Sequence, residues 1–207
     1  GDDQSVWIFR ARVLDGREPH ESIEAMAVDY ADEIRRVRQH GPYFIGALCI
    51  GAFVAIEIAR LLRAAGETVL PLLLLDPPER AFTVHEANAT DSAILSRLRE
   101  REAEVGSTAT LDDPAYASAS VRVARAFEDA IGRYRTCPYD GPVCMLVSSD
   151  RLARAPRTQW RKIYAGETAQ YVVADRHTEV LDARTPRFAE ALGKALRRVF
   201  GVTPASS

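Results

Sequence analysis

The sequence predicts an α/β fold, in which a mostly parallel sheet carries helices on both faces. Strand-like apolar runs alternate with helical repeats along most of the chain. One such run, within residues 43–52, passes through small residues around Cys49 directly into a helical repeat. The chain has 207 residues, of which 47% are hydrophobic, so it can bury one sizeable core. A single domain spanning residues 1–207 is therefore the simplest organisation.

The first part of the chain predicts a strand, a helix and a second strand. Residues 6–9, with the sequence Val-Trp-Ile-Phe, have the apolar composition of a strand. Residues 21–39 predict a helix, because their apolar side chains recur at close to a helical spacing. Residues 43–47 predict the next strand. Residues 51–65 then form a helical repeat, which Gly66 is expected to end.

A buried strand at residues 68–75 is expected to deliver Asp76 at its carboxyl end. Residues 77–117 interrupt the alternation, because they are polar, rich in Glu and Arg and helical in places. We interpret them as an inserted lid that lies over the candidate site and shapes a substrate channel or contacts a partner. The last expected elements are a helix around residues 120–134, strands at 142–148 and 169–174, a helix at 186–200 and a frayed tail at 204–207.

The turn around Cys49 is the centre of the candidate site. The pattern Ala47-x-Cys49-x-Gly51 matches the G-x-S-x-G nucleophile elbow, with Ala for the first Gly and Cys for Ser. Small residues on both sides let the strand and the helix pack closely around a strained central residue. Backbone N–H groups and the helix dipole favour negative charge at such a turn, so we expect a lowered thiol pKa and a thiolate.

A thiol nucleophile needs a base and a group that orients it. His177 is the expected base, because it alone of the four histidines follows both the nucleophile and a late strand. Two carboxylates are candidates for the orienting acid. Asp76 and Asp150 both end predicted strands, and both satisfy the chain order nucleophile, acid, histidine.

Composition excludes several other classes of function. The net charge of −2, without a basic stripe, argues against nucleic acid or an anionic membrane as the main partner. The longest apolar runs fall far short of the roughly 20 residues that span a bilayer, and no signal peptide is recognised. Cys49, Cys137 and Cys144 form no C-x-x-C pair, which fits a reducing compartment better than a zinc site. We therefore expect a cytoplasmic protein with no metal.

Several segments together resemble the thioesterase domains that terminate nonribosomal peptide and polyketide synthetases. They are residues 41–76, the Pro-Tyr-Asp-Gly-Pro-Val stretch at 138–143, and Trp160 followed by Asp175-Arg176-His177. The resemblance extends upstream, where residues 6–12, 14–16 and 22–27 are similar to the family's segment between an early strand and its first long helix. The resemblance implies an α/β-hydrolase fold. It also implies a reaction in which an acyl or peptidyl chain leaves the phosphopantetheine arm of a carrier protein by hydrolysis or cyclisation. In this family the acid follows the strand after the nucleophile's helix, which implies Asp76, and no metal or diffusible cofactor is used.

The chain departs from the family pattern at two points. Cys49 replaces the usual Ser, so the acyl-enzyme would be a thioester that stays activated for capture by an amine or hydroxyl within the chain. The family's first strand and its Gly-rich loop, which supplies one oxyanion donor, would precede Val6, so we expect them to be missing. The backbone N–H of Ile50 is then the expected oxyanion donor.

Two alternatives to this chain-releasing function are a stand-alone editing thioesterase and a non-catalytic carrier-binding module with the same fold.

Overall fold

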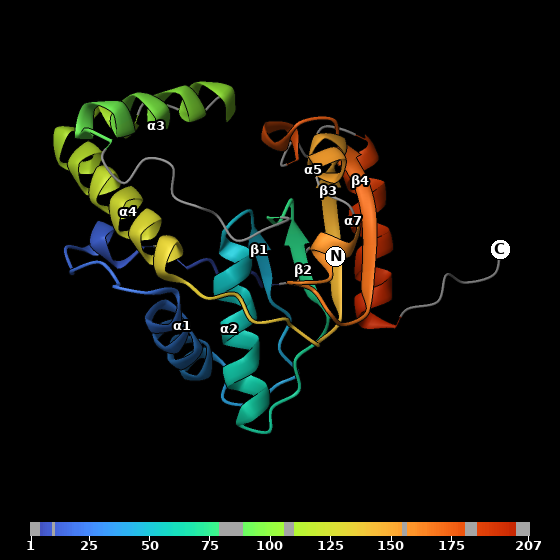
Figure 1. Cartoon of the computed structure of the whole chain (residues 1–207). Coiled ribbons are helices and arrows are strands. Elements are labelled where there is room, and N and C mark those ends of the chain that lie inside the picture. Colours follow the sequence, from blue (N-terminus) through green and yellow to red (C-terminus); the bar gives the residue numbers. More distant parts are fainter. Residues whose placement is uncertain are drawn as a thin grey trace. The chain divides into compact units, whose positions relative to one another are not determined.

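The computed structural model describes residues 5–9, 11–78, 89–105, 110–154, 157–180 and 186–201 (Figure 1). Contacts within the chain define two compact units. One comprises Gly1–Ser22 and Val84–Arg133, and the other comprises Ile23–Thr83 and Tyr134–Ser207. The second unit contains the sheet and every residue of the candidate site.

The sheet consists of four parallel strands in the order β1-β2-β3-β4. Their bounds are β1 Gly46–Leu48, β2 Leu72–Leu75, β3 Val143–Ser148 and β4 Thr168–Ala174. The two central strands are almost entirely buried, which explains why their sequences are continuous apolar runs and do not alternate. All four carboxyl ends meet at one edge of the sheet, where α/β folds place their functional loops.

Helices cover both faces of the sheet. On one face, α7 (Pro186–Phe200) packs Ala191, Ala195 and Val199 against strand residues that include Leu73 and Leu146. Side chains alternate along a strand, so the strand residues next to Leu73 and Leu146 point to the opposite face of the sheet. On that other face, α2 (Gly51–Ala64) contacts β1 and β2 and packs against α1 (Ile23–Val37), as Figure 1 shows. Short helices follow the last two strands: α5 Ser149–Arg154, α6 Arg157–Trp160 and the 3-10 helix η3 His177–Glu179.

In the described part of the other unit, all the regular elements are helices. Its elements are η1 Arg12–Asp15, α3 Asp91–Val105, η2 Thr110–Asp112 and α4 Pro114–Arg133. An ion pair of 3.4 Å between Arg97 and Glu128 joins α3 to α4, and Arg122 pairs with Glu18 at 3.1 Å. No helix in the described ranges of either unit is long and apolar enough to cross a membrane.

Most of the predicted elements are confirmed. The helices expected at residues 21–39 and 51–65 and the strands expected at 142–148 and 169–174 lie within a few residues of their predicted bounds, and α7 has the predicted bounds. Gly66 follows α2 with φ +83°, as its predicted role as a helix stop requires. The strand expected at 43–47 is shorter, because residue 43 makes only an isolated bridge to Val69.

The strand expected at residues 6–9 is wrong. Val6, Trp7 and Ile8 are 77%, 70% and 85% exposed, and their segment belongs to no strand. Apolar composition favours an extended backbone, but a strand exists only where a neighbouring strand pairs with its N–H and C=O groups. The described sheet thus begins at β1, and no strand precedes β1 within residues 5–9 and 11–45.

The helix expected around residues 120–134 begins earlier, at Pro114. Asp113 Oδ1 accepts hydrogen bonds from the backbone N–H groups of Ala115 at 2.8 Å and Tyr116 at 3.2 Å, and Pro occupies the first helical position. The predicted lid therefore contains α3, η2 and the first turn of α4. Residues 79–88 and 106–109 of the lid, and the tail at 204–207, lie outside the described residues. The position of the lid over Cys49 stays a prediction.

Candidate active site

Cys49 lies on the turn between β1 and α2. Its φ of +50° is in the left-handed region, which residues other than Gly rarely adopt. The Cys49 N–H donates to the Leu75 carbonyl at 2.8 Å, and its own carbonyl accepts from the Ala52 N–H at 3.0 Å. Backbone strain of this kind persists only where the surrounding structure holds it, as in a nucleophile elbow.

Ala47 and Gly51 face each other across this turn. A Cβ added to Gly51 would lie 3.8 Å from the Ala47 Cβ, which is an ordinary contact distance. We therefore expect Gly51→Ala to fold and react normally. Gly51→Leu should lower the free energy of unfolding by about 1–3 kcal/mol, because its extra carbons must enter a packed junction. Urea unfolding of both variants measures this, and equal stability would contradict close packing at the elbow.

Asp76 and His177 are in direct contact. Asp76 follows β2 with φ +44° and is fully buried, and His177 begins η3 after β4. The distance between His177 Nδ1 and Asp76 Oδ2 is 2.6 Å. An ionised carboxylate can only accept, so the proton lies on Nδ1. The other ring nitrogen, Nε2, is then left for proton exchange with a thiol.

The Asp76 carboxylate is fully engaged. Its Oδ1 accepts from the backbone N–H of Ser148 at 2.7 Å and from the Ser148 hydroxyl at 3.0 Å. Burial acts to raise the pKa of the carboxyl group. The hydrogen bonds from His177 and Ser148 and the charge of Arg151 outweigh burial and hold the pKa below its ordinary value. Asp76 is thus ionised at neutral pH.

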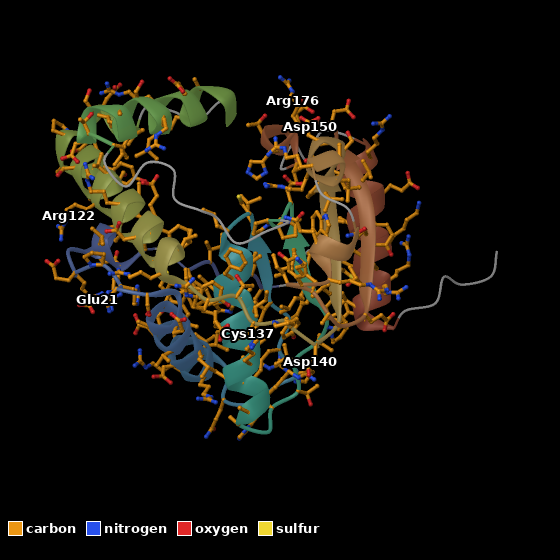
Figure 2. All side chains as sticks on the ribbon, in the orientation of Figure 1. Glu21, Arg122, Cys137, Asp140, Asp150 and Arg176 are labelled. Carbon is orange, nitrogen blue, oxygen red and sulfur yellow. The ribbon has the colours of Figure 1, made fainter. Side chains whose placement is uncertain are left out.

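The second candidate acid, Asp150, lies elsewhere. Its side chain is exposed in the first turn of α5, on the same side of the molecule as Arg176 (Figure 2). Its backbone N–H donates to the Asp175 carbonyl at 3.1 Å. The structure therefore brings Asp76, and not Asp150, to His177.

Sequence reasoning missed Arg151, the residue after Asp150. This side chain, on α5, is only 5% exposed. Its Nε donates to Asp76 Oδ2 at 3.2 Å, and its Nη2 lies 4.0 Å from Cys49 Sγ and 3.3 Å from His177 Nδ1. The available signal was an arginine three residues after the end of a buried strand, at the edge of the sheet where Cys49 was already placed.

Cys49 and His177 shift each other's pKa in opposite directions. Burial acts to raise the pKa of the Cys49 thiol, but the hydrogen bond and charge of His177, the charge of Arg151 and the Ile50 N–H together lower it. The hydrogen bonds to Asp76 and then to Cys49 raise the pKa of His177 to about 9, although burial opposes this. The lowered thiol pKa and the raised imidazole pKa both favour a thiolate and imidazolium pair over a neutral thiol and imidazole.

The remaining thiols lie in different settings. Cys137 is exposed, and Figure 2 shows it with Asp140 at the opposite end of the sheet from Asp150. Burial raises the pKa of the Cys144 thiol, which lies inside β3. Among the described residues, no three His, Cys, Asp or Glu side chains form a group that could hold a metal ion.

Comparison with known proteins identifies the family. The model of the thioesterase domain family matches residues 2–196. A non-reducing polyketide synthase, tpeB, of Talaromyces stipitatus is 47% identical over 62 residues, which are 30% of this chain and 3% of that protein. The nonribosomal peptide synthetase btyA of Aspergillus terreus is 36% identical over 109 residues, covering 49% of this chain and 12% of that protein. The chain thus spans only a small part of these curated relatives.

Solved structures share the fold. The NocB thioesterase domain, in covalent complex with a fluorophosphonate nocardicin G analog, has a TM-score of 0.66 at 23% identity, covering 91% of this chain and 81% of that one. The type II thioesterase BorB of the borrelidin cluster has a TM-score of 0.69 at 22% identity, covering 88% and 76%. These likenesses identify the α/β-hydrolase fold of thioesterases. With the family model matching almost the whole chain, the protein belongs to the thioesterase domain family.

Proposed function

We propose that this domain releases an acyl or peptidyl chain from the phosphopantetheine arm of a carrier protein through a covalent Cys49 acyl-enzyme. The main support is the linked set of Cys49, His177 and Asp76, in which the carboxylate contacts the imidazole at 2.6 Å and the hydrogen bond and charge of the imidazole act to lower the pKa of the thiol. The relatives are synthetases that make polyketides and nonribosomal peptides, which supports a carrier-bound thioester as the substrate and natural product biosynthesis as the setting. The proposal requires no metal or diffusible cofactor.

Acylation is a transfer between two sulfur atoms. The Cys49 thiolate attacks the thioester carbon, and the Ile50 N–H donates to the oxyanion that develops. The bond from carbon to Cys49 sulfur forms and the bond to pantetheine sulfur breaks. The departing pantetheine sulfur takes the proton of the His177 imidazolium, so the charges balance. Asp76 meanwhile keeps the ring oriented through Nδ1.

Release repeats these steps with a new nucleophile. Neutral His177 removes a proton from a hydroxyl or amine of the bound chain, or from water, and the resulting nucleophile attacks the Cys49 thioester. Cys49 leaves as a thiolate and the imidazolium is restored. Because a thioester keeps the acyl group activated, we propose cyclisation as the favoured release and hydrolysis as the competing one.

An editing thioesterase is the second candidate. Type II thioesterases, among them YbtT of the yersiniabactin pathway with a TM-score of 0.67 at 20% identity, share this fold. A four-domain nonribosomal peptide synthetase does so too, with a TM-score of 0.73 at 21% identity. Substrate preference separates the two functions, because an editing enzyme should prefer short acyl groups on a carrier over a full-length chain.

Intact-protein mass spectrometry tests the acyl-enzyme. The protein is mixed with a short acyl thioester of N-acetylcysteamine, which mimics the pantetheine arm. We expect a mass gain of one acyl group in the wild type and in Cys137→Ala, and none in Cys49→Ala. Chromatography of products from chains with and without an internal amine then separates cyclisation from hydrolysis.

Two outcomes would overturn the proposal. A mass gain that persists in Cys49→Ala would place the nucleophile elsewhere. A wild type that forms no adduct and no product, yet binds an acylated carrier protein, would support the non-catalytic binding module.

A further inference from the structure

Arg151 is a buried cation that the proposed reaction does not use. Two nitrogens of its guanidinium contact different residues of the candidate site. Nε is 3.2 Å from Asp76 Oδ2, and Nη2 is 4.0 Å from Cys49 Sγ. We propose that Arg151 is a positioning residue that stabilises the thiolate form of Cys49 over its acylated form. It thereby sets how readily the acyl group returns to the pantetheine thiol. This inference rests on the proposed function.

The geometry argues against a purely structural ion pair. If Arg151 were only structural, its contact with Asp76 would be sufficient. Its Nη2, however, also lies near the Cys49 sulfur. Nη2 is 3.3 Å from His177 Nδ1 as well, yet the Nδ1 proton is directed to Asp76 at 2.6 Å. Arg151 and His177 therefore donate to the same carboxylate oxygen and lie side by side facing Cys49.

Within the described ranges of the chain, the charged and hydrogen-bonding groups around Cys49 come from four segments. His177 contributes an imidazolium from η3, Arg151 a guanidinium from α5, Ile50 a backbone N–H before α2, and Asp76 a carboxylate after β2. Among these described groups, the two cations match the thiolate and the carboxylate in charge. Without Arg151 the same set would carry an uncompensated negative charge in a half-buried site, which is unfavourable.

Acylation removes the attraction between the Arg151 guanidinium and the Cys49 thiolate. The sulfur becomes neutral when its bond to the acyl carbon forms, and the His177 proton leaves with the pantetheine thiol. At equilibrium with neutral solvent His177 regains its proton, because acylation leaves in place the Asp76 hydrogen bond that raises its pKa. The repulsion between Arg151 and the imidazolium is then the same in both states, and only the attraction to the sulfur is lost. Arg151 therefore stabilises the free enzyme more than the acyl-enzyme. Loss of Arg151 should consequently shift the equilibrium toward the acyl-enzyme while making the thiolate scarcer at neutral pH.

Two measurements test the inference in a Cys137→Ala background, which removes the exposed thiol. The first is the ratio of acylated to free enzyme at fixed concentrations of acyl thioester and free N-acetylcysteamine. The second is the pH dependence of Cys49 alkylation by iodoacetamide. For Arg151→Met we expect the alkylation profile to move up by about one pH unit. The ratio should rise about tenfold when it is measured at a pH above the midpoints of both alkylation profiles, where Cys49 is a thiolate in both proteins.

Arg151→Lys keeps the positive charge but lacks the planar guanidinium that contacts both Asp76 and Cys49. Both readouts in this variant should therefore lie between those of the wild type and those of Arg151→Met. Arg154→Met, at an exposed position of the same helix, should leave both unchanged. An unchanged ratio and an unchanged alkylation profile in Arg151→Met would overturn the inference, as would a fall in the ratio. If Arg151→Met does not fold, a partial shift of both readouts in Arg151→Lys supports the inference, and wild-type values of both readouts in that variant overturn it. If the wild type forms no acyl-enzyme, the proposed function fails, while the alkylation profile still tests Arg151.

Discussion

Replacing Asp76 with alanine is expected to lower the free energy of unfolding by about 3–5 kcal/mol, in addition to slowing acylation. Asp76 is fully buried, and its two oxygens accept hydrogen bonds from Ser148, His177 and Arg151. The substitution removes the carboxylate that opposes a buried guanidinium, and it removes the acceptor of the Ser148 N–H. One substitution thus disturbs the buried side chains of both Ser148 and Arg151.

Urea unfolding followed by tryptophan fluorescence measures the loss of stability. Asp76→Asn is the matched control, because the amide keeps the volume and one acceptor but loses the charge. Its stability should lie between those of the wild type and Asp76→Ala, whereas its acylation should remain strongly impaired, since an amide does not fix the proton on Nδ1. The double variant Asp76→Ala with Arg151→Met should recover part of the stability, because both charges are then absent.

The effect should depend on pH in a defined direction. The pKa of Asp76 is lowered in the folded protein, so its ionisation stabilises the fold above the ordinary carboxyl pKa of about 3.9. This contribution is lost as the pH falls through the lowered pKa of the folded state. The stability difference between the wild type and Asp76→Asn should therefore narrow in acid. A difference that stays constant from pH 7 to pH 3 would show that the charge of Asp76 does not carry the effect.

Local patterns in the sequence predicted the elements that depend on local interactions. The helical repeat of α7, bounded by Pro186, and the small residues around Cys49 were sufficient because adjacent residues determine those structures. The same reasoning failed for residues 6–9, whose strand would require a partner strand that no local pattern specifies. It also placed the start of α4 too late, because the Asp113-Pro114 capping signal was overlooked.

The candidate site was predicted only in part, because some of its contacts join residues that are far apart in the sequence. Chain order alone left Asp76 and Asp150 as equal choices, and the family resemblance favoured Asp76. The structure separates them through the pairing of β2 with β3, which places the end of one strand beside the end of the other. The same pairing brings Arg151 to Asp76 across 75 positions of sequence. A contact of that range depends on strand order and register, which the residues around Arg151 do not encode.

Replacing His177 with alanine is expected to slow acylation by about 10²- to 10⁴-fold, the usual contribution of a positioned acid or base. The wild type should show a bell-shaped dependence of kcat/KM on pH. Activity should fall on the acid side as the thiolate of Cys49 gains a proton, below the ordinary thiol pKa of about 8.5. It should fall on the basic side as His177 loses its proton near pH 9, because the leaving pantetheine sulfur then has no proton donor.

The two limbs of this profile report different groups, so the variants should alter them separately. In His177→Ala the basic limb should vanish, and the alkylation profile of Cys49 should move up to the range of an unactivated thiol or beyond, because burial then acts with less opposition. His40→Ala is the matched control, since His40 is exposed and pairs with Glu67 at 3.0 Å, away from Cys49. It should retain both limbs. A His177→Ala protein with a wild-type alkylation profile would show that another group activates the thiol. Such a result would leave the Arg151 guanidinium and the Ile50 N–H as the groups that activate the thiol, and it would reduce His177 to the proton donor of the leaving group.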